Sequence, residues 1–143
     1  MSSMKTIIRI ITIITVAMSF LGCSTSHKDY GNAIFSTAEL ILEDKMDQFD
    51  AIIIIPGSGC TGCISQAELY FSNNKDNERV LFIFTNYYSY KNMSLRLGGS
   101  DNLCRNNVYL DDDNTFYLQE YAEHIYPYYI AIENNNVLTT RPL

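Results

Sequence analysis

Basic residues are scarce in this chain, and their scarcity limits the partners it can bind. Ten lysines and arginines stand against 16 aspartates and glutamates, and the formal charge is −6 at pH 7. Such a balance keeps a protein soluble and argues against nucleic acid or anionic lipid headgroups as partners. Internal repeats, low-complexity tracts and tryptophan are also absent. The sequence therefore indicates one domain of about 110 residues, a length that can bury a workable core.

Long hydrophobic runs are lacking as well. The apolar stretch over 10–21 has 12 residues, whereas a membrane-spanning helix needs about 20. The stretch follows Lys5 and Arg9 and precedes a polar segment, an arrangement typical of a secretory signal. We therefore expect residues 1–22 to be a signal peptide.

The end of this segment is similar to the lipobox of bacterial lipoproteins, because a glycine and Cys23 directly follow the apolar stretch. The resemblance implies a diacylated Cys23 as the first mature residue, which anchors the protein in the cell envelope, facing the periplasm. Cleavage at a neighbouring bond, which would release a soluble secreted protein, is the alternative. Removal of residues 1–22 leaves 8 basic and 16 acidic side chains, a formal charge of −8. Disulfides persist in that compartment.

Cysteines number four, and two of them form the most informative motif. Cys60 and Cys63 follow an apolar run, Ala51–Ile55, and a turn rich in proline and glycine. The pattern predicts a buried strand that passes into the N-terminus of a helix, where the positive end of the helix dipole stabilises a thiolate. The spacing of three lets the second sulfur reach the first, so that the pair can close and open as a disulfide. This motif indicates a redox site.

The rest of the chain alternates between helical and strand patterns. Residues 23–35 are predicted to be a polar tether and residues 36–143 the domain, with a capping box of Ser36 and Glu39 at its start. Strands are predicted at 51–55, 80–85, 108–110, 128–133 and 137–140. Helices are predicted at 36–49, from Cys60 onward, at 89–98 and around 118–122. This order predicts an α/β sandwich with a mixed central sheet, parallel in its first half and antiparallel in its last pair.

The strand order, the CxxC motif after the first core strand and the proline before the penultimate strand resemble the thioredoxin superfamily. The sequence looks most like the TlpA-type branch, which is common as envelope lipoproteins in Bacteroidetes and inserts a helix and a strand between the two halves of the fold. Residues 89–98 and 107–111 would be that insertion, and Pro127–Asn136 is similar to the branch's ending. The resemblance covers about residues 50–140. It implies a thioredoxin-like fold. This sequence departs from that fold in having no C-terminal helix pattern, and we expect the 36–49 helix to cover the sheet face instead.

The resemblance also implies a thiol–disulfide oxidoreductase. Cys60 would be the exposed attacking thiolate, and Cys63 the more buried thiol that resolves the mixed disulfide. Pro127 would be a cis-proline beside the dithiol, where the backbone of Tyr126 pairs with a client strand; an ordinary trans-proline is the alternative. The dithiol needs no organic cofactor. The implied partners are thiols or disulfides of exported proteins and a redox partner at the membrane.

Two other functions stay open. A permanently closed Cys60–Cys63 bond would make the chain a non-catalytic interaction scaffold. Alternatively, Cys60, Cys63 and His124 would carry copper or zinc, with Cys104 as a further ligand. Otherwise Cys104 is either a second resolving thiol or a half-buried small residue.

A few further groups have a structural interpretation beside a functional one. Tyr87, Tyr88 and Tyr90 form either a client-binding patch or ordinary core and rim packing. The acidic run Asp111–Asn114 lacks the alternating acids of a calcium loop, which favours a turn. His27 is expected to be solvated in the tether.

Overall fold

A mixed five-stranded sheet forms the centre of the molecule. The computed structural model describes residues 25–143, so the expected signal peptide and Cys23 lie outside the described residues. The strands are β1 (Ala51–Pro56), β2 (Val80–Thr85), β3 (Val108–Asp111), β4 (Tyr128–Glu133) and β5 (Asn136–Pro142), in the spatial order β3-β2-β1-β4-β5. β1, β2 and β3 are parallel, β4 is antiparallel to β1, and β5 is antiparallel to β4. The predicted mixed sheet is confirmed.

β1 and β2 lie at the centre of the sheet because both of their faces are apolar. All residues of the two strands are buried. Successive side chains point to opposite faces, so Ile52 and Ile54 join one core cluster while Ile53 and Ile55 join the other. Continuous β-branched runs of this kind suit strands that are covered on both faces.

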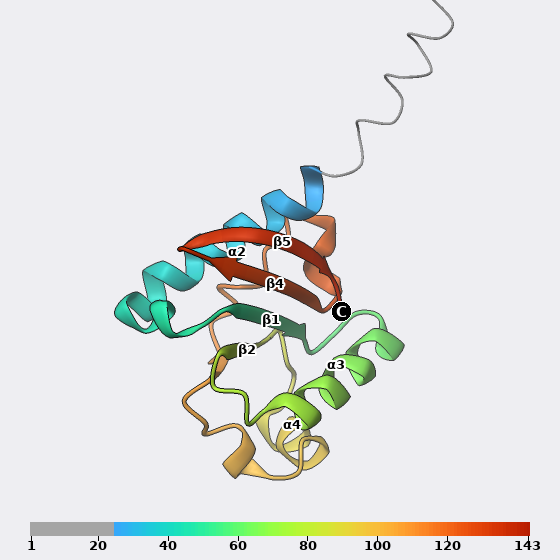
Figure 1. The fold of residues 1–143 in the computed structure, drawn as a ribbon. Helices are drawn as coiled ribbons and strands as arrows, with labels where there is room; N and C mark the ends of the chain where they lie inside the picture. Colours follow the sequence, from blue (N-terminus) through green and yellow to red (C-terminus); the bar gives the residue numbers. More distant parts are fainter. Residues whose placement is uncertain (1–24) are drawn as a thin grey trace, which may run out of the picture.

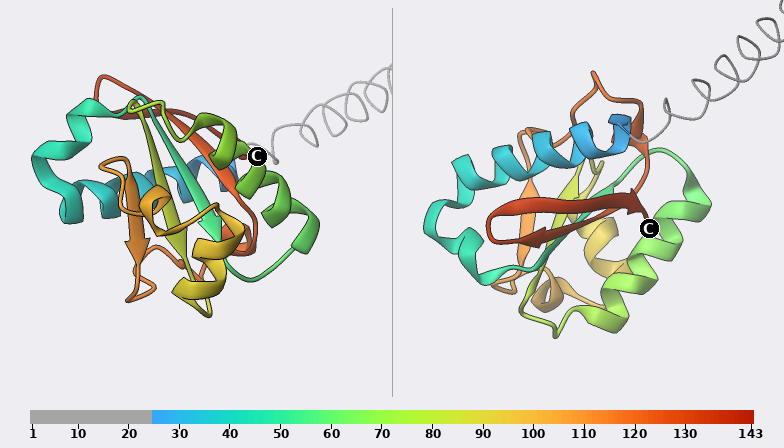
Figure 2. Two further views of the ribbon diagram at one scale, coloured as in Figure 1. Left: turned by 90° about the horizontal axis from the view of Figure 1, so that it is seen from below. Right: turned by 45° about the horizontal axis from the view of Figure 1, so that its top comes forward.

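Helices cover both faces of the sheet. α2 (Thr25–Leu42) and the 3-10 helix η1 (Glu43–Gln48) pack on one face, and α3 (Thr61–Asn74) and α4 (Tyr90–Arg96) lie on the other. Figures 1 and 2 show the resulting layers, with α2 running across the β4–β5 hairpin. The fold is an α/β sandwich. None of the helices within residues 25–143 combines the length and the apolar character needed to cross a membrane.

The predicted tether is wrong for the described part of residues 23–35, because it is helical and belongs to the core. Tyr30, Ile34 and Ala38 recur at intervals of four, which places them on one face of α2, and all three are buried. Ser36 lies exposed in the middle of the helix and caps nothing, so the predicted capping box is also wrong. The expectation that a helix before β1 covers one sheet face is confirmed, with an earlier start.

The helix that follows β2, α4, forms as predicted. Ser89 is the N-cap of α4, and its Oγ accepts a hydrogen bond from Asn92 N at 3.3 Å. Gly98 and Gly99 end this segment with φ angles of 84° and 117°, which favour glycine. A short 3-10 helix, η2 (Ser100–Asn102), then leads towards β3.

The helix predicted around residues 118–122 is absent from the described chain. The segment after β3 is a series of turns that ends in a 3-10 helix, η3 (Ala122–Ile125). The backbone bonds here, Tyr117 N to Asn114 O and Tyr121 N to Leu118 O at 3.1 Å, close separate turns and do not continue into a helix. Before them, the Asp111 carboxylate accepts hydrogen bonds from Thr115 N at 2.9 Å and Phe116 N at 2.8 Å. The two Asp111 bonds satisfy backbone donors of the turn after β3, and Phe116 is fully buried beneath it.

Candidate redox site

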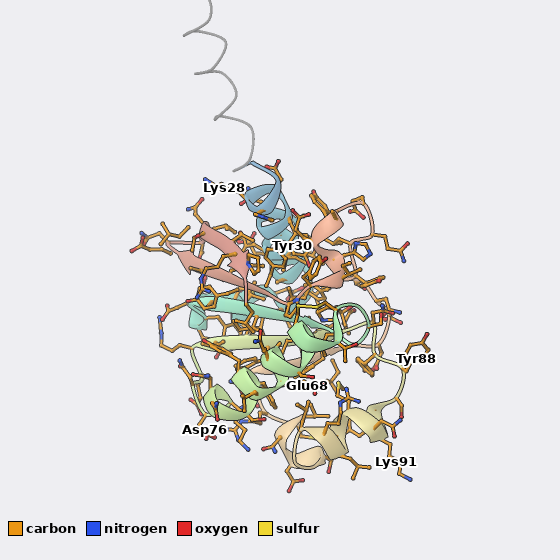
Figure 3. The ribbon with its side chains drawn as sticks, turned by 90° about the vertical axis from the view of Figure 1, so that its right-hand side faces the viewer. Lys28, Tyr30, Glu68, Asp76, Tyr88 and Lys91 are labelled. Carbon is orange, nitrogen blue, oxygen red and sulfur yellow. A yellow bond between two sulfur atoms is a disulfide. The ribbon has the colours of Figure 1, made fainter. Side chains whose placement is uncertain are left out.

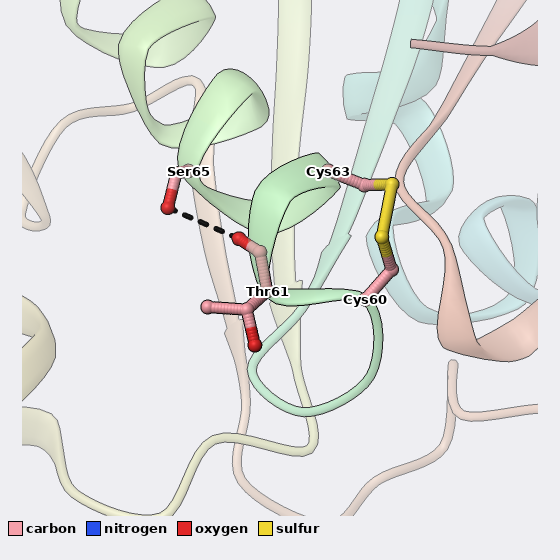
Figure 4. Close-up of a disulfide and its surroundings, with 4 residues drawn as sticks. All are labelled: Cys60, Thr61, Cys63 and Ser65. Atoms are coloured by element: carbon pink, nitrogen blue, oxygen red, sulfur yellow. Dashed lines mark hydrogen bonds between the residues drawn. A yellow bond between two sulfur atoms is a disulfide. The ribbon is translucent and has the colours of Figure 1, made fainter.

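The dithiol loop connects the end of β1 to the start of α3. Cys60 is the N-cap residue of α3, and Cys63 lies in the first turn of that helix. The two cysteines form a disulfide with a Cα–Cα distance of 5.3 Å, within the ordinary range (Figure 4). Both residues are half-buried, so the predicted contrast between an exposed Cys60 and a more buried Cys63 is not seen. The structure thus brings the predicted pair together.

The electrostatic setting of the loop favours negative charge. The first helical hydrogen bond of α3 runs from Ile64 N to Cys60 O at 2.9 Å. The N–H groups before Ile64 therefore have no carbonyl acceptor within the helix, as is usual in a first turn. The first turn contains no acidic residue, and no side chain caps it. A thiolate at this position meets the positive end of a helix of 14 residues.

Two glycines let the dithiol loop pass between its neighbours. A Cβ atom on Gly57 would lie 2.5 Å from Tyr87 Cα, and one on Gly59 would lie 2.2 Å from the carbonyl oxygen of Ile125. Gly59 also has a φ of 141°. Gly57 N donates to Thr85 O at 2.8 Å. The loop is therefore held between the end of β2 on one side and η3 on the other.

Tyr126 and Pro127 follow η3 directly and lie beside this loop, but not in the expected conformation. Residues 25–143 contain no cis peptide bond, so Pro127 is trans and the cis expectation is wrong. The N–H of Tyr126 donates to Glu123 O at 2.9 Å, which leaves it unavailable to a client strand. The Tyr126 side chain is 40% exposed at the rim.

A polar cavity of about 310 Å³ lies on the other side of the dithiol loop. It runs from Gly57 along the first turns of α3 to Glu68 and Arg96. Arg96 Nη2 donates to Glu68 Oε1 at 2.8 Å, and this bond raises the pKa of the guanidinium. The ion pair joins α3 to α4 at the far end of the cavity.

The carboxyl ends of β2 and β3 support the same edge of the sheet. Asp111 is buried, and its Oδ2 accepts from Thr85 Oγ1 at 2.6 Å. Asn86 Nδ2 donates to Ser58 Oγ at 2.5 Å and so reaches the dithiol loop. Asp111–Asn114 is a turn, in agreement with the sequence-based prediction.

The tyrosines after β2 were predicted either to form a client-binding patch or to pack in the core and rim, and they differ in their surroundings. Tyr87 donates a hydrogen bond to Asp112, and burial together with that bond raises the pKa of the phenol. Tyr88 is 97% exposed and projects from the surface (Figure 3). Tyr90 lies near Cys104, which is exposed and is the free thiol of the described chain. Of these three tyrosines, Tyr88 and Tyr90 are therefore the exposed ones.

The metal-binding alternative gains no support from the arrangement of these side chains. Within residues 25–143, no group of three or more histidine, cysteine, aspartate or glutamate side chains is placed to hold a metal ion. His124 Nδ1 contacts Tyr121 O, and its ring packs on Tyr117. Cys60, Cys63, Cys104 and His124 therefore do not form the predicted ligand set.

Sequence reasoning missed one polar group close to the site. His27, in the first described turn of α2, lies 2.9 Å from Glu123 Oε1 and 2.9 Å from Tyr128 Oη, both through its Nδ1. His27 is therefore not a solvated tether residue. The helical spacing of Tyr30, Ile34 and Ala38 was the signal that would have placed it on α2. We call His27, Glu123 and Tyr128 the His27 cluster.

Comparison with known proteins adds no relative: no family model, curated protein or solved structure matches this chain.

Proposed function

We propose that this chain is a thioredoxin-like thiol–disulfide oxidoreductase, similar to the TlpA-type branch and anchored in the cell envelope through a lipid on Cys23. The single observation that carries the proposal is the position of Cys60 and Cys63, which bridge one another at the N-terminus of α3 directly after a central parallel strand. The order β2-β1-β4-β5, with β3 added outside β2, supports the same likeness. α4 and β3 occupy the segment assigned to the branch's insertion.

The chemistry follows from the two sulfurs. In the reducing direction, the Cys60 thiolate attacks one sulfur of a client disulfide, so that a mixed disulfide forms and the other client sulfur leaves as a thiolate. The Cys63 thiolate then attacks Cys60, which releases the second client thiol and closes the Cys60–Cys63 bond. Two electrons pass to the client, and a redox partner at the membrane restores them. The oxidising direction is the reverse of these steps.

The surroundings of the dithiol suit this role. Both cysteines keep some exposure, which attack on a client requires. The helix terminus stabilises the attacking thiolate, and Gly62, between the two cysteines, has open space where a side chain would begin. A permanent disulfide that closes a loop of so few residues would contribute little to the stability of the fold.

The deciding experiment measures the reduction potential of the pair in glutathione buffers. The protein is the full chain with Cys23→Ser and Cys104→Ser, so that the dithiol is the only pair of thiols. We expect a potential within about −270 to −120 mV, the range of catalytic dithiols. A Cys63→Ser variant should accumulate mixed disulfides through Cys60, whereas Cys60→Ser should not. A potential below about −300 mV without trapping would instead identify a structural bond and an interaction scaffold.

A further inference from the structure

The His27 cluster joins three elements that are far apart in the sequence. His27 belongs to the first described turn of α2, Glu123 to η3 and Tyr128 to the start of β4. The His27 and Tyr128 rings also contact each other, with centroids 5.4 Å apart. Each contact of the cluster bridges α2 to the segment that leads into β4.

Burial makes the contact with Glu123 energetically important. The Glu123 side chain is only 5% exposed, whereas that of His27 is 43% exposed. A buried carboxylate is costly unless hydrogen bonds and opposite charge compensate for the lost water. His27 Nδ1 lies 2.9 Å from one oxygen of this carboxylate, and Tyr128 Oη lies 2.9 Å from the same nitrogen. The neighbouring charges of α2, Lys28 and Asp29, are exposed, and His124 of η3 turns to Tyr117 and Tyr121.

η3 connects this cluster to the dithiol loop within a few residues. Ile125 lies two positions after Glu123, and its carbonyl oxygen lies 2.2 Å from the position that a Cβ atom of Gly59 would take. Gly59 immediately precedes Cys60. If η3 shifts away from the loop, the backbone just before the attacking cysteine therefore loses its contact with Ile125. Figure 4 shows η3 on the same side of α3 as the two sulfurs.

We propose that His27 and Glu123 are a positioning pair, which holds η3 against the dithiol loop and thereby sets the reduction potential of Cys60–Cys63. The inference rests on the proposed function and deepens it. A loop that is held in place keeps the two sulfurs close together and favours the disulfide. A loop released by η3 separates the thiols more often, and the disulfide becomes easier to reduce.

The test measures the equilibrium constant of the dithiol with glutathione in the full chain carrying Cys23→Ser and Cys104→Ser. We expect His27→Gln to weaken the disulfide three- to tenfold, and tenfold corresponds to about 30 mV towards less negative potential. Tyr128→Phe keeps the ring and removes the hydroxyl, so we expect a smaller shift in the same direction. The double variant His27→Gln with Glu123→Gln replaces the imidazole and the buried carboxylate by two amides that can hydrogen-bond to each other, and should recover at least half of the loss.

Lys28→Gln is the matched control. It removes a positive charge from the same turn of α2, but the Lys28 side chain points away from the domain, whereas Tyr30 points into it (Figure 3). We expect Lys28→Gln to leave the equilibrium constant unchanged within twofold. Thermal melting confirms that each variant is folded, and Tyr128→Phe replaces His27→Gln in the comparison if the latter is unfolded.

Two results would overturn the inference: a folded His27→Gln or Tyr128→Phe variant with the parent equilibrium constant, or an equal shift in Lys28→Gln. Neither result bears on the proposed function, because the equilibrium constant is measurable for a structural disulfide as well. The proposed function fails separately, when the chain with an intact His27 cluster traps no mixed disulfide.

Discussion

At the scale of single residues, one carboxylate organises the edge of the sheet that carries the dithiol. Asp111 is 2% exposed and receives three donors: Thr85 Oγ1, Thr115 N and Phe116 N. It ends β3, orders the turn that follows and fixes Phe116 in the core. The side chain thus joins β2, the turn after β3 and the core.

Replacement of Asp111 by asparagine should destabilise the domain by about 1–3 kcal/mol. The NH2 group of the amide would face one of the backbone donors, Thr115 N or Phe116 N, and that buried N–H would lose its acceptor. The free energy of unfolding in urea measures the loss. Asp113→Asn is the control, because Asp113 is exposed in the same turn and should leave stability unchanged. Equal stability of the two variants would contradict the structural role of Asp111.

The same residue shows where sequence-based prediction of the site stops. Cys60 and Cys63 were predicted correctly as a pair, because a three-residue spacing at a helix start brings two sulfurs together whatever the rest of the fold does. Asp111 was predicted only as part of a turn, because its bond to Thr85 on β2 spans 26 residues and depends on strand pairing. Contacts that span 25 residues or more leave no local pattern, and the His27 cluster was missed for the same reason.

At the scale of secondary structure, α2 determines how one face of the sheet is closed. The helix crosses the β4–β5 hairpin at close range, because Gly31 faces β5 without a side chain. A Cβ atom at Gly31 would lie 1.9 Å from Thr140 Oγ1 and 3.0 Å from Thr140 Cβ. The absence of a side chain at this position therefore sets the distance between helix and sheet.

Gly31→Ala should destabilise the domain by about 1–3 kcal/mol, because overpacking of the interface outweighs the better helix propensity of alanine. Thermal unfolding measures the change. Thr140→Ala in the same chain should restore part of the loss, since it removes the closest atom. Gly62→Ala provides the opposite control: a Cβ atom added there would have no atom within 4 Å, so a gain of about 0.5–1 kcal/mol is expected in α3. Destabilisation by Gly62→Ala as large as that by Gly31→Ala would refute the packing argument.

The elements themselves were predictable to different degrees. Strands β1 and β2 follow from unbroken apolar runs, and α4 follows from Ser89 and the two glycines after it, because both signals are local. The start of α2 was predicted too late, since polar residues near Ser36 resemble a helix cap in sequence. Only the stripe of Tyr30, Ile34 and Ala38 reveals the earlier start.

At the scale of the whole molecule, buried tyrosines link α2 to the sheet and make the stability of the fold decrease at alkaline pH. Burial, followed by the nearby charges of Glu123 and Tyr126, raises the pKa of Tyr128 to about 12. Burial and the neighbouring Tyr128 and Glu123 also raise the pKa of Tyr30 well above its ordinary value. Both phenols remain neutral in the folded state at pH values where they ionise in the unfolded chain.

The domain should therefore lose stability as the pH rises above about 10. Below the unfolded-state pKa of tyrosine, about 10, neither phenol is ionised and the stability is fully present. Between pH 10 and 12 the unfolded state loses protons first, and unfolding is favoured. Urea titrations at pH 9, 10 and 11 measure the slope, which should be smaller in Tyr30→Phe and unchanged in the exposed Tyr88→Phe. An identical slope in all three proteins would exclude Tyr30 as a cause.

The lipid anchor is a second prediction for the whole molecule. In a bacterial host, the chain should incorporate radiolabelled fatty acid and sediment with membranes. Cys23→Ala should abolish both, while the Cys60–Cys63 bond still forms, because the two sites are independent. Cys63→Ala is the matched cysteine variant and should retain the label. Labelling of the Cys23→Ala chain would contradict the proposed anchor.

The position of the first turn of α2 would limit the length of the proposed attachment between the domain and the membrane. His27 is fixed to η3, at the end of the sheet where the dithiol lies. Only four peptide units separate it from Cys23, and they span at most about 14 Å whatever path they take. With the proposed lipid on Cys23, the two sulfurs would work within a few nanometres of the bilayer surface. Proteins embedded in the membrane, or held close to it, would then be within reach. A protein free in the periplasm would have to approach the membrane surface before it could exchange disulfides with this site.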